Sequence, residues 1–131
     1  MHLLLVEDDL ELGAELQRAL SGYGLTSEWV RGTRHARAMT EGECDDDTPH
    51  FACVLLDSRL PDGDGIDLIT ELKKVQPGAR VVAMSGGGRY LEGSDYLKLA
   101  RGIGAHSALM KPFTWAQLQA AMDQALANQP A

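Results

Sequence analysis

Short apolar runs alternate along the chain with longer segments in which apolar residues recur at helical spacing. The runs predict five β-strands, at residues 3–6, 26–30, 51–56, 80–84 and 107–110. All but the second are nearly continuous in apolar residues, which is typical of parallel strands that are covered on both faces. The pattern therefore indicates a buried parallel sheet.

Helical spacing predicts five helices that alternate with these strands. In the first, Leu12, Leu16 and Leu20 recur every four residues and share one face. In the second helix, Thr33 is the expected cap before Ala36 and Met39. The third spans residues 66–75 and stops before Pro77, and the fourth is marked by Leu97, Ala100 and Ile103. In the fifth, Thr114 is the expected cap before Trp115, Leu118, Met122 and Ala125. Strands and helices in alternation predict a doubly wound α/β fold.

Length and composition are those of one globular domain. The chain has 131 residues, of which 44% are hydrophobic and 24% charged. No apolar run approaches the roughly 20 residues that cross a bilayer. The first run leads directly into Glu7, Asp8 and Asp9, without the cationic start of a signal peptide. We therefore expect one cytoplasmic domain, residues 1–131, with no membrane association.

The charge balance is acidic, with 19 Asp and Glu against 12 Lys and Arg and a net charge of -7. Binding to nucleic acid depends on clustered Lys and Arg that displace counterions from phosphates. Nucleic acid is therefore not an expected partner. Arg31, Arg34 and Arg37 are expected to form a solvated helix face rather than a docking patch.

The two cysteines show neither metal-binding spacing nor a disulfide framework. We expect Cys53 to be buried in its apolar strand and Cys44 to be exposed in an acidic loop. The four histidines, His2, His35, His50 and His106, form no constellation with a nucleophile or a metal ligand and are expected at the surface.

Polar residues whose side chains are suited to binding or catalysis follow four of the predicted strands. Glu7 and Asp8 follow the first, Asp57 the third, Ser85 the fourth and Lys111 the fifth. In an open parallel sheet, ligands gather at the carboxyl ends of the strands. Carboxylates that converge there repel each other by about 4 kcal/mol per pair at about 4 Å and an effective dielectric near 20. A hard divalent cation such as Mg²⁺ would offset this repulsion.

The remaining groups at these strand ends suit an anion. Lys111 supplies a point charge for a phosphoryl oxygen, and Ser85 supplies a hydroxyl donor. The backbone amides of Ser58 and Gly86 are expected to face the anion. Two interpretations of the run 86–88 are open, an anion-binding nest or a plain loop. Together these groups predict phosphoryl transfer onto the carboxylate of Asp57.

In four places, the sequence resembles the receiver domain of two-component response regulators. The matching pieces are Leu3-Leu4-Leu5-Val6-Glu7-Asp8-Asp9, Val54-Leu55-Leu56-Asp57 with Leu60-Pro61 and Asp64-Gly65, Val82-Ala83-Met84-Ser85-Gly86, and Lys111-Pro112-Phe113. The resemblance covers nearly the whole chain. It implies a flavodoxin-like sheet in the strand order 2-1-3-4-5.

The resemblance also implies roles for individual residues. Asp57 would be the phosphoacceptor and a ligand of Mg²⁺. Asp8 would bind the metal directly, Glu7 through water, and Arg59 through its backbone carbonyl. Ser85 would turn toward the phosphoryl group and Lys111 would bind it, with a cis peptide bond before Pro112. One departure concerns the aromatic residue that the family usually carries three residues before the lysine, because this sequence has Ala108 there.

The function implied is that of a signalling module rather than an enzyme. A histidine kinase or a histidine phosphotransfer protein would phosphorylate Asp57, and phosphorylation would change the contacts with a downstream protein. Its only catalysis would be its own phosphoryl transfer and autodephosphorylation. Three alternatives are open: a degenerate receiver that binds partners without phosphorylation, a hydrolase with an aspartyl-phosphate intermediate, and a receiver cut from a longer regulator.

A simpler interpretation of the first acidic group is also open. Glu7, Asp8 and Asp9 precede a predicted helix, and acidic side chains stabilise the positive end of a helix. Taken alone, these residues are explained equally well as helix caps.

Overall fold

The computed structural model describes residues 1–41, 51–57, 59–86 and 93–127. Its main sheet has five strands in the order β2-β1-β3-β6-β7, and all neighbouring pairs are parallel. The strands are β1 (His2–Val6), β2 (Thr26–Val30), β3 (Cys53–Asp57), β6 (Arg80–Ser85) and β7 (Ser107–Met110). The predicted doubly wound sheet and its order are confirmed.

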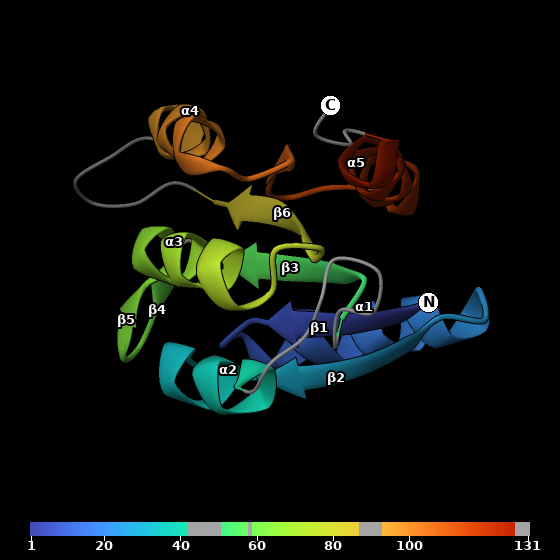
Figure 1. Ribbon diagram of the computed structural model, residues 1–131. Coiled ribbons are helices and arrows are strands. Elements are labelled where there is room, and N and C mark those ends of the chain that lie inside the picture. The colour runs from blue at the N-terminus through green and yellow to red at the C-terminus, as the bar shows by residue number, and fades with distance from the viewer. Residues whose placement is uncertain (42–50, 58, 87–92, 128–131) are drawn as a thin grey trace.

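Helices cover both faces of this sheet (Figure 1). They are α1 (Leu10–Gly22), α2 (Thr33–Thr40), α3 (Gly65–Val75), α4 (Gly93–Ile103) and α5 (Trp115–Ala127). Buried side chains of α2, α3 and α4 pack on one face, and those of α1 and α5 pack on the other. Within the described residues, no helix is long and apolar enough to span a membrane.

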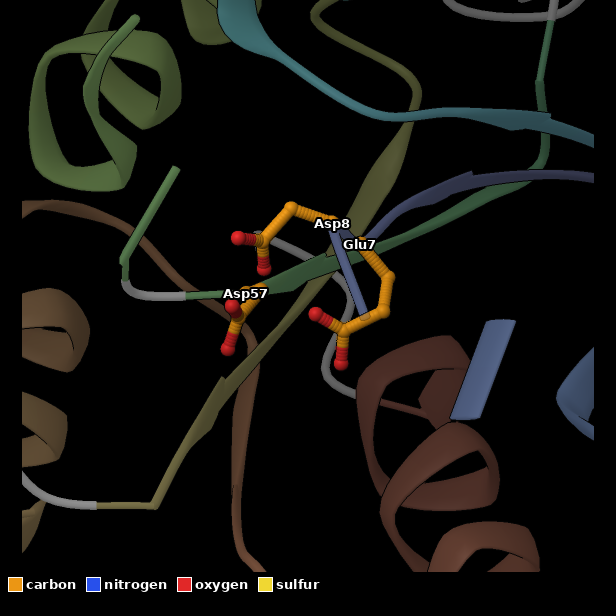
Figure 2. A group of neighbouring side chains, drawn as sticks. All are labelled: Glu7, Asp8 and Asp57. Atoms are coloured by element: carbon orange, nitrogen blue, oxygen red, sulfur yellow. The ribbon is translucent and has the colours of Figure 1, made fainter. Parts of the chain in front are cut away.

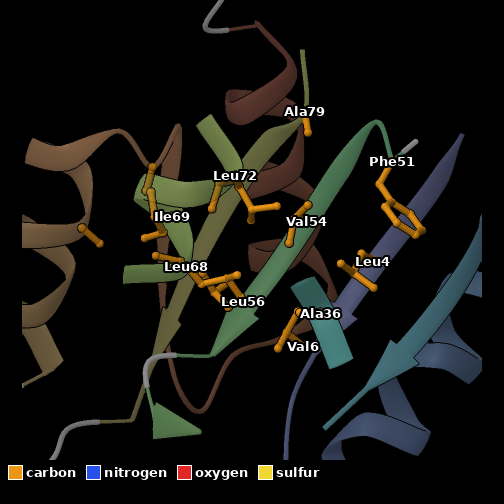
Figure 3. Close-up of a cluster of buried hydrophobic side chains, with 14 of the residues drawn as sticks. Leu4, Val6, Ala36, Phe51, Val54, Leu56, Leu68, Ile69, Leu72 and Ala79 are labelled. Carbon is orange, nitrogen blue, oxygen red and sulfur yellow. The ribbon is translucent and has the colours of Figure 1, made fainter. Parts of the chain in front are cut away.

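Successive residues of the central strands contribute to opposite cores. Leu4 and Val6 of β1 face the cluster that contains Leu68 and Leu72 of α3 (Figure 3). Leu3 and Leu5 face the cluster beneath α1 and α5. Because both faces are covered, every position of β3 is buried, which explains the nearly continuous apolar sequence of the strands.

Two additional short strands, β4 (Arg59–Leu60) and β5 (Gly63–Asp64), form an antiparallel pair that the sequence pattern did not predict. Pro61 and Asp62 connect them. The pair lies directly after β3 in the chain and leads into α3. It therefore shapes the segment that follows Asp57.

The two predicted helix caps have different outcomes. At α5 the prediction is confirmed, because the Gln117 amide donates to Thr114 Oγ1 (3.2 Å) and the Thr114 amide donates to Gln117 Oε1 (2.8 Å). At α2 it is wrong: Thr33 is the first helical residue, and the cap position is Gly32, which has no side chain. The amides of Thr33 and the next residue instead donate to Asp62, which lies 29 positions away in sequence from Thr33.

The surface prediction for His106 is also wrong. Its ring is half-buried, and Nδ1 accepts a hydrogen bond from the Val81 amide (3.0 Å). Burial, with Arg80 and Lys73 nearby, lowers the pKa of His106 to about 4. This histidine thus replaces a backbone carbonyl as an acceptor at the start of β6.

The prediction for Cys53 is confirmed. Its side chain is fully buried, and burial raises the pKa of the thiol to about 12. Cys44 and His50 lie outside the described residues.

Of the three arginines expected on a solvated helix face, Arg31 and Arg34 are exposed, whereas Arg37 forms an ion pair with Glu71 of α3.

Candidate functional site

The register of the parallel strands brings the predicted site residues to one edge of the sheet. Val6 lies opposite Leu56 in β1 and β3, so the next residues, Glu7 and Asp57, leave neighbouring strands at the same level. On the far side of β3, Ser85 ends β6. The carboxyl ends of three strands thus meet here.

Three carboxylates converge at this edge (Figure 2). One oxygen each of Glu7, Asp8 and Asp57 can be chosen so that all three lie within 4.8 Å of one another. Glu7 is fully buried, Asp57 is 5% exposed and Asp8 is half-buried. Such a group of partly desolvated acids needs a cationic partner.

Lys111 supplies one positive charge. Its Nζ lies 2.5 Å from Glu7 Oε1 and 3.0 Å from Asp57 Oδ1, so it bridges two of the three acids. Burial disfavours the charged ammonium, but the hydrogen bond to Glu7 and the charge of Asp57 outweigh this and raise the pKa of Lys111. The lysine is held in place by the strand pairing, because its amide donates to the Ser85 carbonyl (2.9 Å).

Glu7 remains only partly neutralised. Burial raises its pKa to about 7 against the opposing hydrogen bond from Lys111, and the charge of Asp57 adds to the rise. Its second oxygen, Oε2, is buried without a hydrogen-bond partner in the described part of the chain. An oxygen-only donor set with one unsatisfied buried oxygen fits a hard cation such as Mg²⁺.

The backbone of the acidic pair is fixed by β2 and the residue after it, a feature that the sequence pattern does not predict. The Trp29 indole N–H donates to the Glu7 carbonyl (2.8 Å), and Arg31 donates to the Asp8 carbonyl (3.4 Å). The Glu7 amide donates to the Val30 carbonyl (3.1 Å). A tryptophan in a weak edge strand carries no sequence signal for this role, because the contact spans 22 positions.

The alternative of helix capping applies to one of the three acids only. Asp9 Oδ1 accepts from the amides of Glu11 (3.0 Å) and Leu12 (3.2 Å), so it caps α1. Glu7 and Asp8 instead belong to the cluster with Asp57. The run of three acids therefore serves two purposes.

A cavity of about 480 Å³ opens beside Lys111. It lies between the start of α1 and the segment after β7, and its lining comprises Asp9, Glu11, Leu12, Glu15, Gly86, Lys111, Pro112 and Phe113. The Lys111–Pro112 peptide bond is cis, as predicted. Its lining combines three acids of α1 and its cap with Lys111 and the apolar residues Leu12, Pro112 and Phe113.

The remaining predicted positions are placed as follows. Ser85 is buried at the end of β6, and Gly86 is exposed. A Cβ added at Gly86 would lie 3.6 Å from Lys111 Cβ. The backbone of Arg59 lies in β4, two residues after Asp57. Ala108 is half-buried in β7 opposite Ala83. Ser58 and residues 87 and 88 lie outside the described residues.

Comparisons with known proteins agree with this architecture. The sequence model of the response regulator receiver domain matches residues 3–123. The chain is 32% identical over 118 residues to the swarming motility regulation protein RssB of Serratia marcescens, and 31% identical over 110 residues to the photosynthetic apparatus regulatory protein RegA of Cereibacter sphaeroides. These matches cover 90% and 84% of this chain but only 49% and 54% of the relatives, so the chain spans about half of their length.

Solved structures show the same fold. The non-phosphorylated HemR receiver domain of Leptospira biflexa superposes with a TM-score of 0.78 at 25% identity, covering 99% of this chain and 97% of that one. A CheY-like receiver domain protein of Methanospirillum hungatei gives a TM-score of 0.80 at 23% identity, with 95% and 92% covered. With the family match over residues 3–123 and the acidic edge described above, the chain belongs to the response regulator receiver domains of two-component systems.

Proposed function

We propose that this domain is a cytoplasmic phosphoryl acceptor whose phosphorylation on Asp57 changes its contacts with a downstream protein. The observation that carries the proposal is the convergence of Glu7, Asp8 and Asp57, two of which are bridged by the ammonium group of Lys111. Receiver domains bind Mg²⁺ in such an acidic pocket and interact with kinases or phosphotransfer proteins. The donor would therefore be the phosphohistidine of a kinase or a phosphotransfer protein.

The transfer exchanges one bond to phosphorus for another. A carboxylate oxygen of Asp57 forms a bond to phosphorus as the bond between phosphorus and the donor's imidazole nitrogen breaks. The electron pair stays on that nitrogen, which takes up a proton. Lys111 lies 3.0 Å from Asp57 Oδ1 and would bind an oxygen of the transferred group, with the hydroxyl of Ser85 and the amides of Ser58 and Gly86 as further donors.

A bound Mg²⁺ would neutralise charge on the phosphoryl oxygens during the transfer. We assign its direct ligands to Asp8, Asp57 and the backbone carbonyl of Arg59, with Glu7 acting through water. The unsatisfied Oε2 of Glu7 and the spacing of the three carboxylates support this assignment.

Phosphorylation can be tested with Mg²⁺ and a small acyl phosphate as donor, followed by intact mass spectrometry. The protein should gain the mass of one phosphoryl group, and Asp57→Asn should gain none. Asp67→Asn, an exposed acid in the first turn of α3, is the matched control and should be phosphorylated like the wild type. An unmodified wild-type mass under these conditions would refute the proposal.

A further inference from the structure

Asp62 joins the segment that follows Asp57 to a distant helix. Its Oδ1 accepts hydrogen bonds from the Thr33 amide (2.7 Å) and the Thr33 hydroxyl (3.1 Å), and its Oδ2 accepts one from the Arg34 amide (3.0 Å). Both oxygens are therefore used on the first turn of α2. The cap position of that helix, Gly32, contributes no side-chain bond of its own.

Two glycines make room for these hydrogen bonds between Asp62 and the first turn of α2. A Cβ at Gly32 would lie 2.7 Å from Asp62 Oδ1, and a Cβ at Gly63 would lie 2.8 Å from Thr33 Oγ1. A side chain at either position would displace the Asp62 carboxylate or the Thr33 hydroxyl from these hydrogen bonds. The backbone amides of Arg34 and Thr33 also lower the pKa of Asp62, so its carboxylate stays charged at neutral pH.

The contact between Asp62 and α2 lies close in the chain to the proposed phosphoacceptor, Asp57. Asp62 lies five residues after Asp57, at the connection between β4 and β5. In β4, which precedes this connection, the backbone of Arg59 pairs with that of Asp64 in β5, and the side chain of Leu60 is buried in the core. The Arg59 carbonyl, a proposed metal ligand, therefore lies in a segment held by two contacts, the buried side chain of Leu60 and the hydrogen bonds of Asp62 to α2.

We propose that Asp62 is a positioning residue that fixes the segment after Asp57 for metal binding by tying it to α2. This inference rests on the proposed function, since it concerns the same site. Groups that orient metal ligands typically change metal affinity by about 10–100-fold when they are removed. Asp62 contacts neither Asp57 nor the other two acids through a hydrogen bond in the described residues, so any effect on the metal must pass through the backbone.

The test measures Mg²⁺ binding to the full chain by isothermal titration calorimetry. In Asp62→Ala, the Mg²⁺ dissociation constant should rise by about tenfold. Asp62→Asn, which keeps one acceptor oxygen, should fall between Asp62→Ala and the wild type. Asp67→Asn removes an exposed acid near the start of α3 and should leave the constant unchanged.

A double variant separates positioning from simple helix capping. Asp62→Ala removes the three atoms nearest to a Cβ at Gly32, because all three belong to the Asp62 carboxylate. Adding Gly32→Asp then gives α2 a local cap, and the extended backbone at Gly32 (φ -157) accepts any residue. The melting temperature should recover in this variant, while Mg²⁺ binding should stay weak because the tie to the segment after Asp57 is still absent.

The outcomes distinguish the two proposals. Unchanged Mg²⁺ affinity in Asp62→Ala, or affinity that recovers together with stability in the double variant, would overturn the positioning role and leave the proposed function standing. A wild-type protein that binds no Mg²⁺ and accepts no phosphoryl group would overturn both. Thr33→Val removes the hydroxyl, which donates to Asp62 and accepts from Arg37, but keeps the backbone amide that donates to Asp62, so it should give a smaller loss of affinity than Asp62→Ala.

Discussion

The two carboxylate oxygens of Glu7 lie in different surroundings. Oε1 is 2.5 Å from Lys111 Nζ, whereas Oε2 is buried without a hydrogen-bond partner in the described residues. The neutral variant Glu7→Gln keeps an acceptor for Lys111 and removes one buried negative charge. We expect it to be more stable than the wild type by about 1–2 kcal/mol, as measured by urea unfolding without Mg²⁺.

The same variant should lose function as it gains stability, because the removed charge is the one proposed to hold the metal through water. Mg²⁺ binding should weaken in Glu7→Gln. Glu15→Gln, an exposed residue of α1, is the matched control and should change stability by no more than about 0.5 kcal/mol. A Glu7→Gln protein less stable than the wild type would contradict this account of the site.

His106 makes stability depend on pH. Its pKa is about 4 in the folded protein, against 6.5 for an ordinary histidine. Above about pH 6.5 the ring is neutral in both states and the folded protein has its full stability. As pH falls toward 4, the unfolded chain binds a proton that the folded chain excludes, because burial and the charges of Arg80 and Lys73 disfavour the imidazolium. Stability is therefore lost across this range.

His106→Asn should remove this dependence, since its side-chain oxygen can accept the same hydrogen bond but does not titrate. Unfolding free energies of both proteins would be compared at about pH 7 and about pH 5. The wild type should lose about 1–2 kcal/mol more than the variant over this interval, after allowing for the partial exposure of the ring. Parallel pH profiles would show that His106 is not the group responsible.

Individual residues differ in how far sequence could predict their place. Glu7, Asp57 and Lys111 each follow an apolar strand, and parallel strands end at a common edge, so their convergence follows from topology. Trp29 and His106 make their key contacts with backbone groups of distant strands. No local pattern identifies such contacts, because any residue with a donor or acceptor of the right reach would look the same in sequence.

At the scale of elements, the close packing of α1 against β2 depends on one glycine, Gly13 of α1, which lies against the Trp29 ring of β2. A Cβ at Gly13 would lie 2.1 Å from Trp29 Cζ2 and 2.2 Å from Trp29 Cε2, too close to the indole ring for a methyl group. Gly13→Ala should therefore destabilise the protein by about 1–3 kcal/mol, although alanine favours the helix by up to about 1 kcal/mol. Trp29 also donates to the Glu7 carbonyl, so the variant should weaken Mg²⁺ binding as well.

The control for this prediction is Gly22→Ala at the end of the same helix, where nothing lies within 4 Å of the Cβ position. It should be neutral or slightly stabilising in thermal unfolding. Trp29→Phe removes atoms from the contact, so Gly13→Ala should cost less in that background than in the wild type. Equal costs in both backgrounds would show that the indole ring is not what excludes the methyl group.

The elements that sequence predicted are those with long patterns. The five main strands and five helices repeat over enough residues for their periodicity to be recognised. The strands β4 and β5 have two residues each, too few to show alternation. The sequence predicts Thr33 as the cap of α2, whereas the acceptor is the carboxylate of Asp62, which lies on the other side of β3 in the chain. Tertiary contact, rather than propensity, decides both features.

At the scale of the whole molecule, the acidic charge is distributed unevenly. Of the 19 Asp and Glu residues, those at positions 7, 8 and 57 are brought together at the carboxyl edge of the sheet. Folding therefore brings the charge of Asp57 to those of Glu7 and Asp8, from which the unfolded chain keeps it apart. A cation that binds the folded state alone should stabilise the whole domain, because its binding free energy adds to that of folding.

Mg²⁺ should accordingly raise the global stability of the domain by mass action. At a concentration about ten times the dissociation constant, the expected gain is about 1.4 kcal/mol, or about 3–6 °C in Tm for a chain of this size. Scanning calorimetry with Mg²⁺, and with NaCl at matched ionic strength, separates specific binding from screening. Asp8→Asn should lose most of the shift, whereas Asp123→Asn, an exposed acid on α5, should keep it. An equal shift in Asp8→Asn, or with NaCl alone, would mean that Mg²⁺ stabilises the protein by general neutralisation of its charge, so that the clustered carboxylates would not be a metal site.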